Sequence, residues 1–377
     1  MEDMTRRDYE HSRPLDVHRW SDHPEVNAFV DRIYKEHIHQ SGTNTQIKKK
    51  HLKVVLLDLY VAWSDDPDLN IAVHMSPNAY SDGTVSSKGN SRYNALHIKV
   101  STIDIVHRLH ISGLIGLKDG WQDVRKGYLT RIWAAEPLTQ MFMDAAFRYF
   151  DIGYPDNKAT VILRDENKRN IEYEDTAETR RMHDLLLRYN RLLERTFIDI
   201  PSLDQPRIEL GDKENRRRNN KPVFVNITHH GKFVRRIFNN GTFNDGGRFY
   251  GGWWQRVGSE YRKDIRMNNV PTVEIDYSSL HVILAYAMVR HDYWDITSDD
   301  PYDLPVRGVN NPDHCRQITK LLFLLSFNAS DEKALFKAFR NELDYTAHPG
   351  QLDRYRDSLR VEMICPTHHS AHMTRHT

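Results

Sequence analysis

Cysteine is scarce in this sequence, in which Cys315 and Cys365 are the two examples. Two widely separated cysteines form neither a disulfide framework nor the closely spaced ligand pairs of a structural zinc site. Long apolar runs are also missing, and no stretch approaches the roughly 20 residues that span a bilayer. The N-terminal segment MEDMTRRDYEHSRP lacks the apolar core that a signal peptide requires. We therefore expect a cytoplasmic protein without a membrane partner.

An excess of charge of one sign is absent as well. The 53 Lys and Arg residues nearly balance the 52 Asp and Glu residues, so a nucleic-acid partner would have to bind to local basic patches. Hydrophobic residues account for 39% of the chain and charged residues for 28%, which is typical of a folded globular protein and not of a disordered one. A chain of 377 residues is long enough for two or three domains.

The beginning of the chain has the pattern of a helical region in an α+β protein. Apolar residues recur at helical spacing over residues 24–39 and again over residues 47–63. The first helix belongs to an N-terminal helical arm over residues 1–47. The second helix opens a separate domain.

A winged helix-turn-helix is indicated over residues 48–140. A predicted helix beginning at Ser101 is followed by two strands that can pair around a basic tip. Helix, strand, wing, strand is the order of this DNA-binding fold, in which Arg108 and Lys126 would contact nucleic-acid phosphates. The alternative is a helical domain whose hairpin binds another protein.

Two segments separate this region from the C-terminal part of the chain. Residues 141–200 form a connector with a hairpin and a helix from Thr176 to Arg195, which has a leucine stripe opposite many arginines. Residues 201–222 are polar and include the basic run KENRRRNNK. We place a basic linker there.

The segment PVFVNITHHGKFVRRIFNNGTFNDGGRFYGGWWQ begins at Pro222 and interleaves short strands with glycine pairs, arginines and aromatic rings. Glycine lets a backbone approach a phosphate, arginine binds phosphate, and aromatic rings stack on bases. One interpretation is a nucleic-acid-binding surface that includes Arg235, Arg236, Arg248 and Tyr250. The other is a set of turns with aromatic residues in the core.

An acid follows a β-rich run in the segment PTVEIDYSSLHVILAYAM, residues 271–288. The pattern places Asp276 at the C-terminal tip of a strand, directly before a helix. A carboxylate held there, beside the carbonyl of Tyr277, is suited to binding Mg²⁺ or Mn²⁺. Glu274 lies on the same side of the predicted strand and is a second candidate metal ligand. The alternatives are a helix cap for Asp276 and a surface position for Glu274.

The segment NPDHCRQITKLLFLLSFNAS, residues 311–330, predicts an apolar helix that starts at Asn311 and Pro312. Arg316 and Lys320 are four residues apart and therefore share one face of this helix. Two cations in this arrangement can hold a triphosphate. A solvated helix edge is the alternative.

Together these three segments resemble the family A DNA polymerases and the related single-subunit RNA polymerases of phages and mitochondria. Asp276-Tyr277-Ser278 is similar to motif A of the palm, and Arg316 and Lys320 are similar to motif B of the fingers. Gly247-Arg248-Phe249-Tyr250 is similar to the Gly-Arg-x-Tyr element that contacts primer and template. The resemblance implies a partial polymerase palm and fingers over residues 223–345, followed by a poorly ordered tail over residues 346–377.

The resemblance also implies roles for individual residues. Asp276 would bind the catalytic metal, and Arg316 and Lys320, as catalytic residues, would neutralise the triphosphate. Tyr277, His281 and Asn328 would contact the nucleotide. His281 stands where family A DNA polymerases carry a sugar-sensing glutamate. Motif C, a His-Asp pair that supplies the second metal-binding acid, has no counterpart after Ser330.

These patterns predict a metal-dependent nucleotidyltransferase that adds nucleotides to a 3′-hydroxyl. Its partners would be a DNA or RNA template and primer and nucleoside triphosphates. The alternative, favoured by the missing motif C, is a non-catalytic DNA-binding replication or regulatory protein with a winged helix and a polymerase remnant. A third interpretation is a metal-dependent nuclease that uses histidines near the C-terminus, namely His368, His369, His372 and His376.

Overall fold

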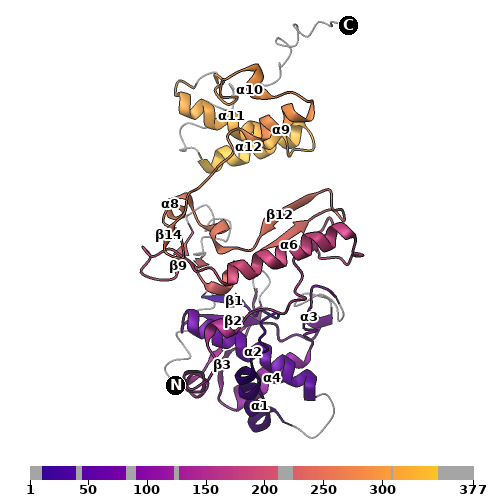
Figure 1. Ribbon diagram of the computed structural model, residues 1–377, viewed down its shortest axis with the longest axis vertical. Helices are drawn as coiled ribbons and strands as arrows, with labels where there is room; N and C mark the ends of the chain where they lie inside the picture. Colours follow the sequence, from indigo (N-terminus) through magenta and orange to yellow (C-terminus); the bar gives the residue numbers. More distant parts are fainter. Residues whose placement is uncertain are drawn as a thin grey trace. The chain divides into compact units, whose positions relative to one another are not determined.

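The computed structural model describes residues 11–39, 45–81, 91–122, 127–210, 224–306 and 309–346. The chain divides into two compact units, Met1–Thr272 and Val273–Thr377. The domain boundaries predicted from the sequence, after residues 47, 140, 200, 222 and 345, stay predictions. The described chain is mixed α/β with small sheets of two to four strands (Figure 1). No helix among the described residues is long and apolar enough to cross a membrane.

The first core of unit 1 surrounds helix α2 (Thr45–Asp65). Every residue of α2 from His51 to Ala62 is buried, as expected for a central helix that packs on all sides. The elements packed with α2 are α1 (Pro24–Ile33), a π-helical turn (Tyr34–Ile38), α4 (Ser101–Ile111) and α5 (Glu136–Met143). The helices predicted over residues 24–39 and 47–63 are therefore confirmed.

A four-stranded sheet completes this core. Its order is β1 (Ser12–Pro14), β2 (Asn70–Val73), β6 (Thr130–Ala134) and β3 (Ile115–Lys118). Strands β3 and β6 are antiparallel, with Ile115 opposite Ala134 and Lys118 opposite Arg131. A short ladder of β4 (Trp121–Gln122) and β5 (Gly127–Tyr128) extends this hairpin. The helix at Ser101 and the hairpin after it are thus formed as predicted.

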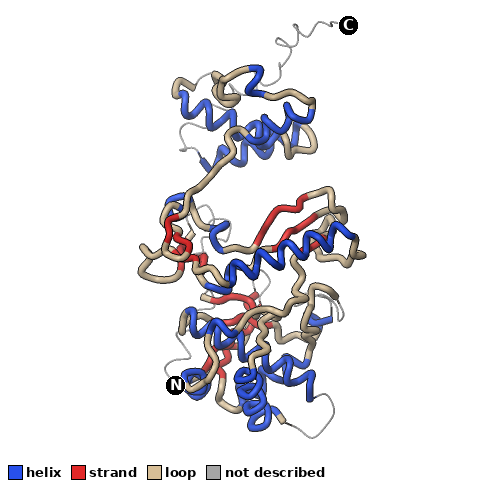
Figure 2. The backbone as a smooth tube through the Cα atoms, in the orientation of Figure 1, coloured by secondary structure: helices blue, strands red, loops and turns tan. Residues whose placement is uncertain are grey.

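The second part of unit 1 is built on α6 (Ala177–Glu194) and a sheet in the order β12 (Gly246–Tyr250), β11 (Arg235–Phe238), β7 (Val161–Leu163). Figure 2 shows α6 running alongside this sheet. The Asn190 side chain on α6 exchanges two hydrogen bonds with the backbone of Val234, at 2.8 and 2.7 Å. Thr176 caps α6 through the backbone N–H of Thr179, so the helix begins where the sequence predicted.

The smaller elements of unit 1 complete this second core. Strands β8 (Ile198–Asp199), β13 (Arg266–Met267) and β14 (Val270–Pro271) form one sheet, and β9 (Arg207–Glu209) pairs with β10 (Phe224–Asn226). The short helices are α3 (Asn78–Ser81), η3 (Tyr149–Asp151), η4 (His229–Lys232), η5 (Trp253–Arg256) and α8 (Ser259–Arg262). The described part of the predicted linker, residues 201–210, therefore contains a paired strand.

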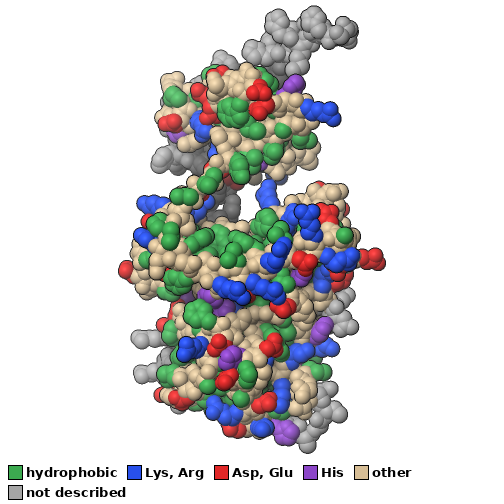
Figure 3. All heavy atoms as spheres, viewed as in Figure 1, with side chains coloured by type: hydrophobic (Ala, Val, Ile, Leu, Met, Phe, Trp, Pro, Cys, Tyr) green, Lys and Arg blue, Asp and Glu red, His purple; other side chains and the backbone are tan. Residues whose placement is uncertain are grey.

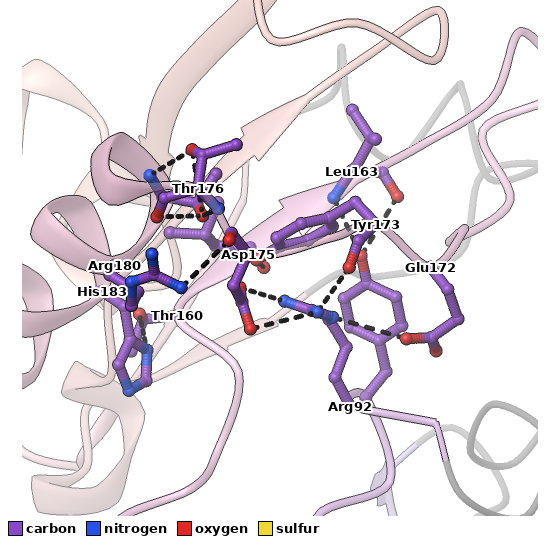
Figure 4. A network of polar contacts seen from close by, with 12 residues as sticks. Arg92, Thr160, Leu163, Glu172, Tyr173, Asp175, Thr176, Arg180 and His183 are labelled. Atoms are coloured by element: carbon purple, nitrogen blue, oxygen red, sulfur yellow. Dashed lines mark hydrogen bonds and ion pairs between the residues drawn. The ribbon is translucent and has the colours of Figure 1, made fainter.

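Arg92 and Tyr93 join the two parts of unit 1. Figure 4 shows the contacts of Arg92 with Tyr173 and Asp175. The Arg92 guanidinium donates to Asp175 at 2.9 Å and to the Tyr173 carbonyl at 2.6 Å, and it lies 3.6 Å from the centroid of the Tyr173 ring. The Tyr93 hydroxyl donates to the carbonyl of Ile171 at 2.8 Å. These contacts satisfy buried backbone groups of the second part with side chains from the first.

Unit 2 is a small helical assembly. Its helices are α9 (Leu280–Met288), α10 (Tyr293–Ile296), α11 (Pro312–Ser326) and α12 (Glu332–Thr346). Val282, Tyr293 and Tyr302 are its buried centre. The Asn311 side chain caps α11 by accepting from the backbone N–H groups of Asp313 and His314, which confirms the predicted start of this helix.

Candidate nucleic-acid and nucleotide interface

Strands β11 and β12 bring together the four residues that the sequence suggested for nucleic-acid binding in this segment. Arg235 lies opposite Tyr250, Arg236 opposite Phe249, and Ile237 opposite Arg248. Side chains alternate between the two faces of a strand, so Arg235, Arg248 and Tyr250 share one face of the hairpin. Arg248 and Tyr250 are exposed. This face combines guanidinium groups with an aromatic ring.

Arg236 occupies the other face and has a different environment. Its Nε donates to the carbonyl of Gly247 at 2.8 Å, and its guanidinium lies 4.9 and 5.6 Å from the ring centroids of Phe238 and Phe249. These contacts tie Arg236 to the hairpin itself. Arg236 therefore supports the hairpin, whereas Arg248 and Tyr250 are available to a ligand.

Helix α6 adds basic surface to the same part of unit 1. Figure 3 shows Lys and Arg side chains gathered over this region. The exposed arginines of α6 and its C-cap are Arg180, Arg181, Arg188, Arg191 and Arg195. Arg191 is paired with Asp156 at 3.1 Å. Local basic patches of this kind attract phosphate groups even when the net charge is close to zero.

Arg108, the winged-helix candidate that the structure describes, is partly buried and paired within its own helix. Arg108 donates from Nε to both carboxylate oxygens of Asp104, one turn earlier in α4, at 3.0 Å. An arginine engaged in this way must exchange its partner before it can contact a phosphate. Lys126 lies outside the described residues.

The prediction that a strand ends at Asp276 is wrong. Strand β14 stops at Pro271, and residues 272–277 have no regular secondary structure. A strand needs hydrogen bonds from a neighbouring strand, and no described strand pairs with this segment. Asp276 is therefore exposed, and the alternating apolar residues Val273, Ile275 and Tyr277 are 83%, 82% and 74% exposed.

The carboxylates in this segment do not make a metal centre by themselves. Carboxylate oxygens are the donors that Mg²⁺ and Mn²⁺ prefer, and Glu274 and Asp276 provide them. The rigid strand that would hold both on one side is missing, however. The described residues contain no group of three His, Cys, Asp or Glu side chains placed to hold a metal ion. The binding of Mg²⁺ or Mn²⁺ by Asp276 and Glu274 stays a prediction.

The two cations predicted to hold a triphosphate lie on α11. Arg316 donates from Nε to Oδ2 of Asp300 at 2.7 Å, and its guanidinium lies 5.8 Å from the ring centroid of Tyr302. Lys320 is exposed one turn further along the helix. A triphosphate at this position would compete with Asp300 for Arg316.

The structure brings His281 close to the C-terminal end of α11. The imidazole of His281 on α9 stacks on the ring of Phe327, with centroids 5.8 Å apart and an interplanar angle of 25°. Asn328, next to Phe327, donates from its side chain to the carbonyl of Leu324 at 2.7 Å. The predicted nucleotide-binding residues His281 and Asn328 are thus neighbours. Tyr277 is exposed ahead of α9.

Sequence reasoning missed a cluster of buried charges in unit 1. Asp58 on α2 accepts from Arg13 at 2.7 Å and from Arg19 at 3.3 Å, and Arg19 also approaches Asp16 at 3.4 Å. Although burial opposes ionisation, Lys158 and Arg19 hold the pKa of Asp16 well below its usual range. Burial lowers the pKa of Lys158 to about 7.

Two further groups of this cluster titrate unusually. Burial raises the pKa of Asp65 to about 6, and the hydrogen bond from the Tyr149 hydroxyl only partly offsets that effect. Burial also holds the pKa of His230 well below its usual range. The basic and acidic members of the cluster are scattered singly along the sequence, so no local motif pointed to them. The available signal was the close spacing of Arg13, Asp16 and Arg19 near the N-terminus.

No protein-family model, curated protein or solved structure matches this chain in the comparisons.

Proposed function

We propose that this protein is a polymerase-like nucleotidyltransferase that binds a nucleic-acid strand along the β11–β12 hairpin and a nucleoside triphosphate beside α9 and α11. The observation that carries the proposal is the pairing of β11 with β12. It places Arg235, Arg248 and Tyr250 on one face, where arginines can hold phosphates and the ring can stack on a base. Mg²⁺ or Mn²⁺ belongs to this proposal as the ion that the transfer reaction requires.

The nucleotide part of the proposal rests on unit 2. The stacking of His281 on Phe327 joins the segment similar to motif A with the segment similar to motif B. Arg316 and Lys320 supply positive charge on α11, and the exposed Asp276 precedes α9. These residues would orient the triphosphate and neutralise its charge.

The order of elements in unit 1 supports a winged-helix contribution to DNA binding. Helix α2, strand β2, helix α4 and strands β3 and β6 follow one another, and the three strands are arranged β2-β6-β3. Helix α4 would be the recognition helix and the β3–β6 hairpin the wing.

A second candidate is a non-catalytic DNA-binding replication or regulatory protein that retains a polymerase-like segment. The conformation of residues 272–277 favours it, because among the described residues this segment is not part of a strand that would place Glu274 and Asp276 on one side. In this candidate function the hairpin surface binds DNA, but no nucleotide transfer takes place.

The test is primer extension with Mg²⁺ or Mn²⁺, using deoxy- and ribonucleotides, run beside binding to the same primed template. Asp276→Asn and Lys320→Ala should abolish extension and leave binding unchanged. Arg248→Ala should weaken binding and reduce the dependence of log Kd on log salt by about one phosphate contact. Arg32→Ala on α1 is the matched control, since Arg32 is an exposed arginine outside the hairpin.

The outcomes separate the two candidates. Extension that is lost in both unit 2 variants supports the nucleotidyltransferase. A wild-type protein that binds primed template without extending it supports the second candidate. Equal binding by wild type, Arg248→Ala and Arg32→Ala would show that the hairpin does not bind the template in either candidate function.

A further inference from the structure

A cavity of about 650 Å³ lies in unit 1, beside the cluster of buried charges. It is lined by the segment from Arg13 to Arg19, by Tyr154 and Lys158, and by residues around His230 and Arg235. These residues come from the loop after β1, the loop before β7 and the chain from η4 to β11. The cavity therefore exists only in the folded unit.

Two polar atoms of the lining residues have no hydrogen-bond partner. They are Nη1 of Arg19 and Nε2 of His230, and both are buried. Arg19 is 3% exposed and His230 is 9% exposed. A buried donor without an acceptor costs about 1–3 kcal/mol, so native proteins nearly always supply a partner. Nη1 of Arg19 is a donor, so it requires an acceptor that no described residue provides. Nε2 of His230 donates or accepts according to its tautomer.

Lys158 adds a buried cation to the same lining. Its Nζ lies 3.1 Å from the ring centroid of Tyr154 and 4.1 Å from that of Phe233. It forms no hydrogen bond or close ion pair with any described residue, although it is only 5% exposed. Two aromatic rings stabilise an ammonium group less than a carboxylate or phosphate would.

The charges around the cavity leave an excess of positive charge. Three carboxylates offset part of it: Asp58 and Asp16 pair with Arg13 and Arg19, Asp16 also favours the charged form of Lys158, and Asp65 lines the cavity. Arg235 lines the cavity as well, and like Lys158 it makes no ion pair within the described chain. Two unpaired cations and two unsatisfied polar atoms therefore surround one space.

We propose that this cavity binds a phosphate group of a nucleotide or of the end of a nucleic-acid strand. A phosphomonoester presents three acceptor oxygens and about two negative charges, which match Lys158, Arg235 and the unsatisfied N–H of Arg19. His230 can donate to it in the tautomer that carries the proton on Nε2. This site shares Arg235 with the hairpin face but does not include Arg248 or Tyr250. It goes beyond the proposed function because it requires neither extension nor strand binding by the hairpin.

The test compares Lys158→Met with Lys53→Met in the full chain. Lys53 is a matched control because it is also buried beside an aromatic ring, 3.8 Å from the centroid of Trp20, but it does not line the cavity. Calorimetric titrations would use inorganic phosphate, adenosine monophosphate, and one oligonucleotide with either a 5′-phosphate or a 5′-hydroxyl. Lys158→Met should weaken phosphate binding about tenfold or more, and Lys53→Met should bind as wild type does.

The arms of the titration identify the source of the phosphate. The ligand is a strand end if the 5′-phosphorylated strand binds more tightly than its 5′-hydroxyl form and Lys158→Met loses this difference. Binding of phosphate and the monophosphate without any effect of the strand's 5′-phosphate assigns a free phosphate compound. In both cases Arg248→Ala should leave the affinity for the phosphate group unchanged. The phosphate site can therefore be confirmed even if strand binding by the hairpin fails.

Two results would overturn the proposal. One is the absence of saturable binding by wild type at about 10 mM of every phosphate compound. The other is phosphate affinity that is equal in wild type, Lys158→Met and Arg235→Gln. The second variant keeps the test decisive if the lysine substitution disturbs folding, which unfolding monitored by circular dichroism would reveal.

Discussion

The Nε atom of Arg316 donates to Oδ2 of Asp300 at 2.7 Å, so the arginine proposed to hold a triphosphate is already paired within unit 2. Both side chains are partly exposed, at 43% and 35%. Such a pair is exchangeable, since exposed ion pairs contribute only about 0.2–1 kcal/mol. We therefore expect Arg316 to stay paired with Asp300 until a phosphate group takes the place of the carboxylate.

Asp300→Asn should therefore increase the affinity for nucleoside triphosphate by up to about fivefold, because Arg316 no longer has a charged partner to exchange. Asparagine keeps an oxygen that can accept from the backbone N–H of Tyr302, as Asp300 does at 2.9 Å. Isothermal titration with a nucleoside triphosphate measures the change. Weaker binding in Asp300→Asn would mean that the ion pair itself, and not a released Arg316, supports the nucleotide.

Gly247→Ala should destabilise unit 1 by about 1–3 kcal/mol. Gly247 has φ +73°, and a Cβ there would lie 2.7 Å from the Phe238 ring and 2.9 Å from a guanidinium nitrogen of Arg236. Gly153→Ala is the control, because a Cβ at Gly153 meets nothing within 4 Å. Urea unfolding of both variants gives the comparison, and equal stability would show that the hairpin tolerates a side chain at this position.

Tyr250→Ala should weaken binding of single-stranded nucleic acid by about 1–3 kcal/mol, the usual contribution of one stacked base. Tyr250→Phe should bind nearly as well as wild type, since the ring provides the stacking surface. Fluorescence anisotropy with a labelled oligonucleotide distinguishes the variants. If both variants lose affinity equally, the hydroxyl and not the ring makes the contact.

The stability of unit 1 should depend on the ionisation of Lys158. Burial lowers the pKa of Lys158 to about 7 in the folded chain, from an ordinary value of 10.5. Asp16 and Glu194 favour the charged form, and Arg19 and Arg235 oppose it. Between these two pKa values the unfolded chain binds a proton that the folded chain does not, so the contribution of Lys158 to stability rises with pH.

Lys158→Met removes this titration. The stability of the variant relative to wild type should be greatest near pH 7 and should fall as the pH approaches 10, by at most about 5 kcal/mol. Guanidinium unfolding of both proteins across this range measures the difference. Parallel profiles would contradict a lowered pKa at this position.

Local sequence patterns predicted much of the secondary structure. Helix α6 begins after Thr176 and helix α11 begins after Asn311, where capping residues precede a helical apolar pattern. The β3–β6 hairpin also forms between the predicted strands. These features depend on hydrogen bonds and side chains that are close together in the sequence, so short-range signals are sufficient to predict them.

Asp276 illustrates where such signals fail. The alternation of Val273, Ile275 and Tyr277 is that of a strand, yet the described chain supplies no neighbouring strand to pair with it. Strand formation depends on a partner that is distant in sequence, and alternation alone does not provide one. The same limit applies to the metal-binding role of Asp276, which required a rigid strand.

The sequence by itself predicted helices α2, α4, α6 and α11 and the strands of the glycine- and arginine-rich segment. The roles that the polymerase resemblance implies for Asp276, Arg316 and Lys320 stay predictions. Only the tertiary structure decided that Arg316 pairs with Asp300, that His281 stacks on Phe327 and that Lys158 is buried beside Tyr154 and Phe233. The reason is physical. Backbone hydrogen bonding and helix caps act over a few residues, whereas burial of charge and pairing of side chains depend on how distant segments pack together.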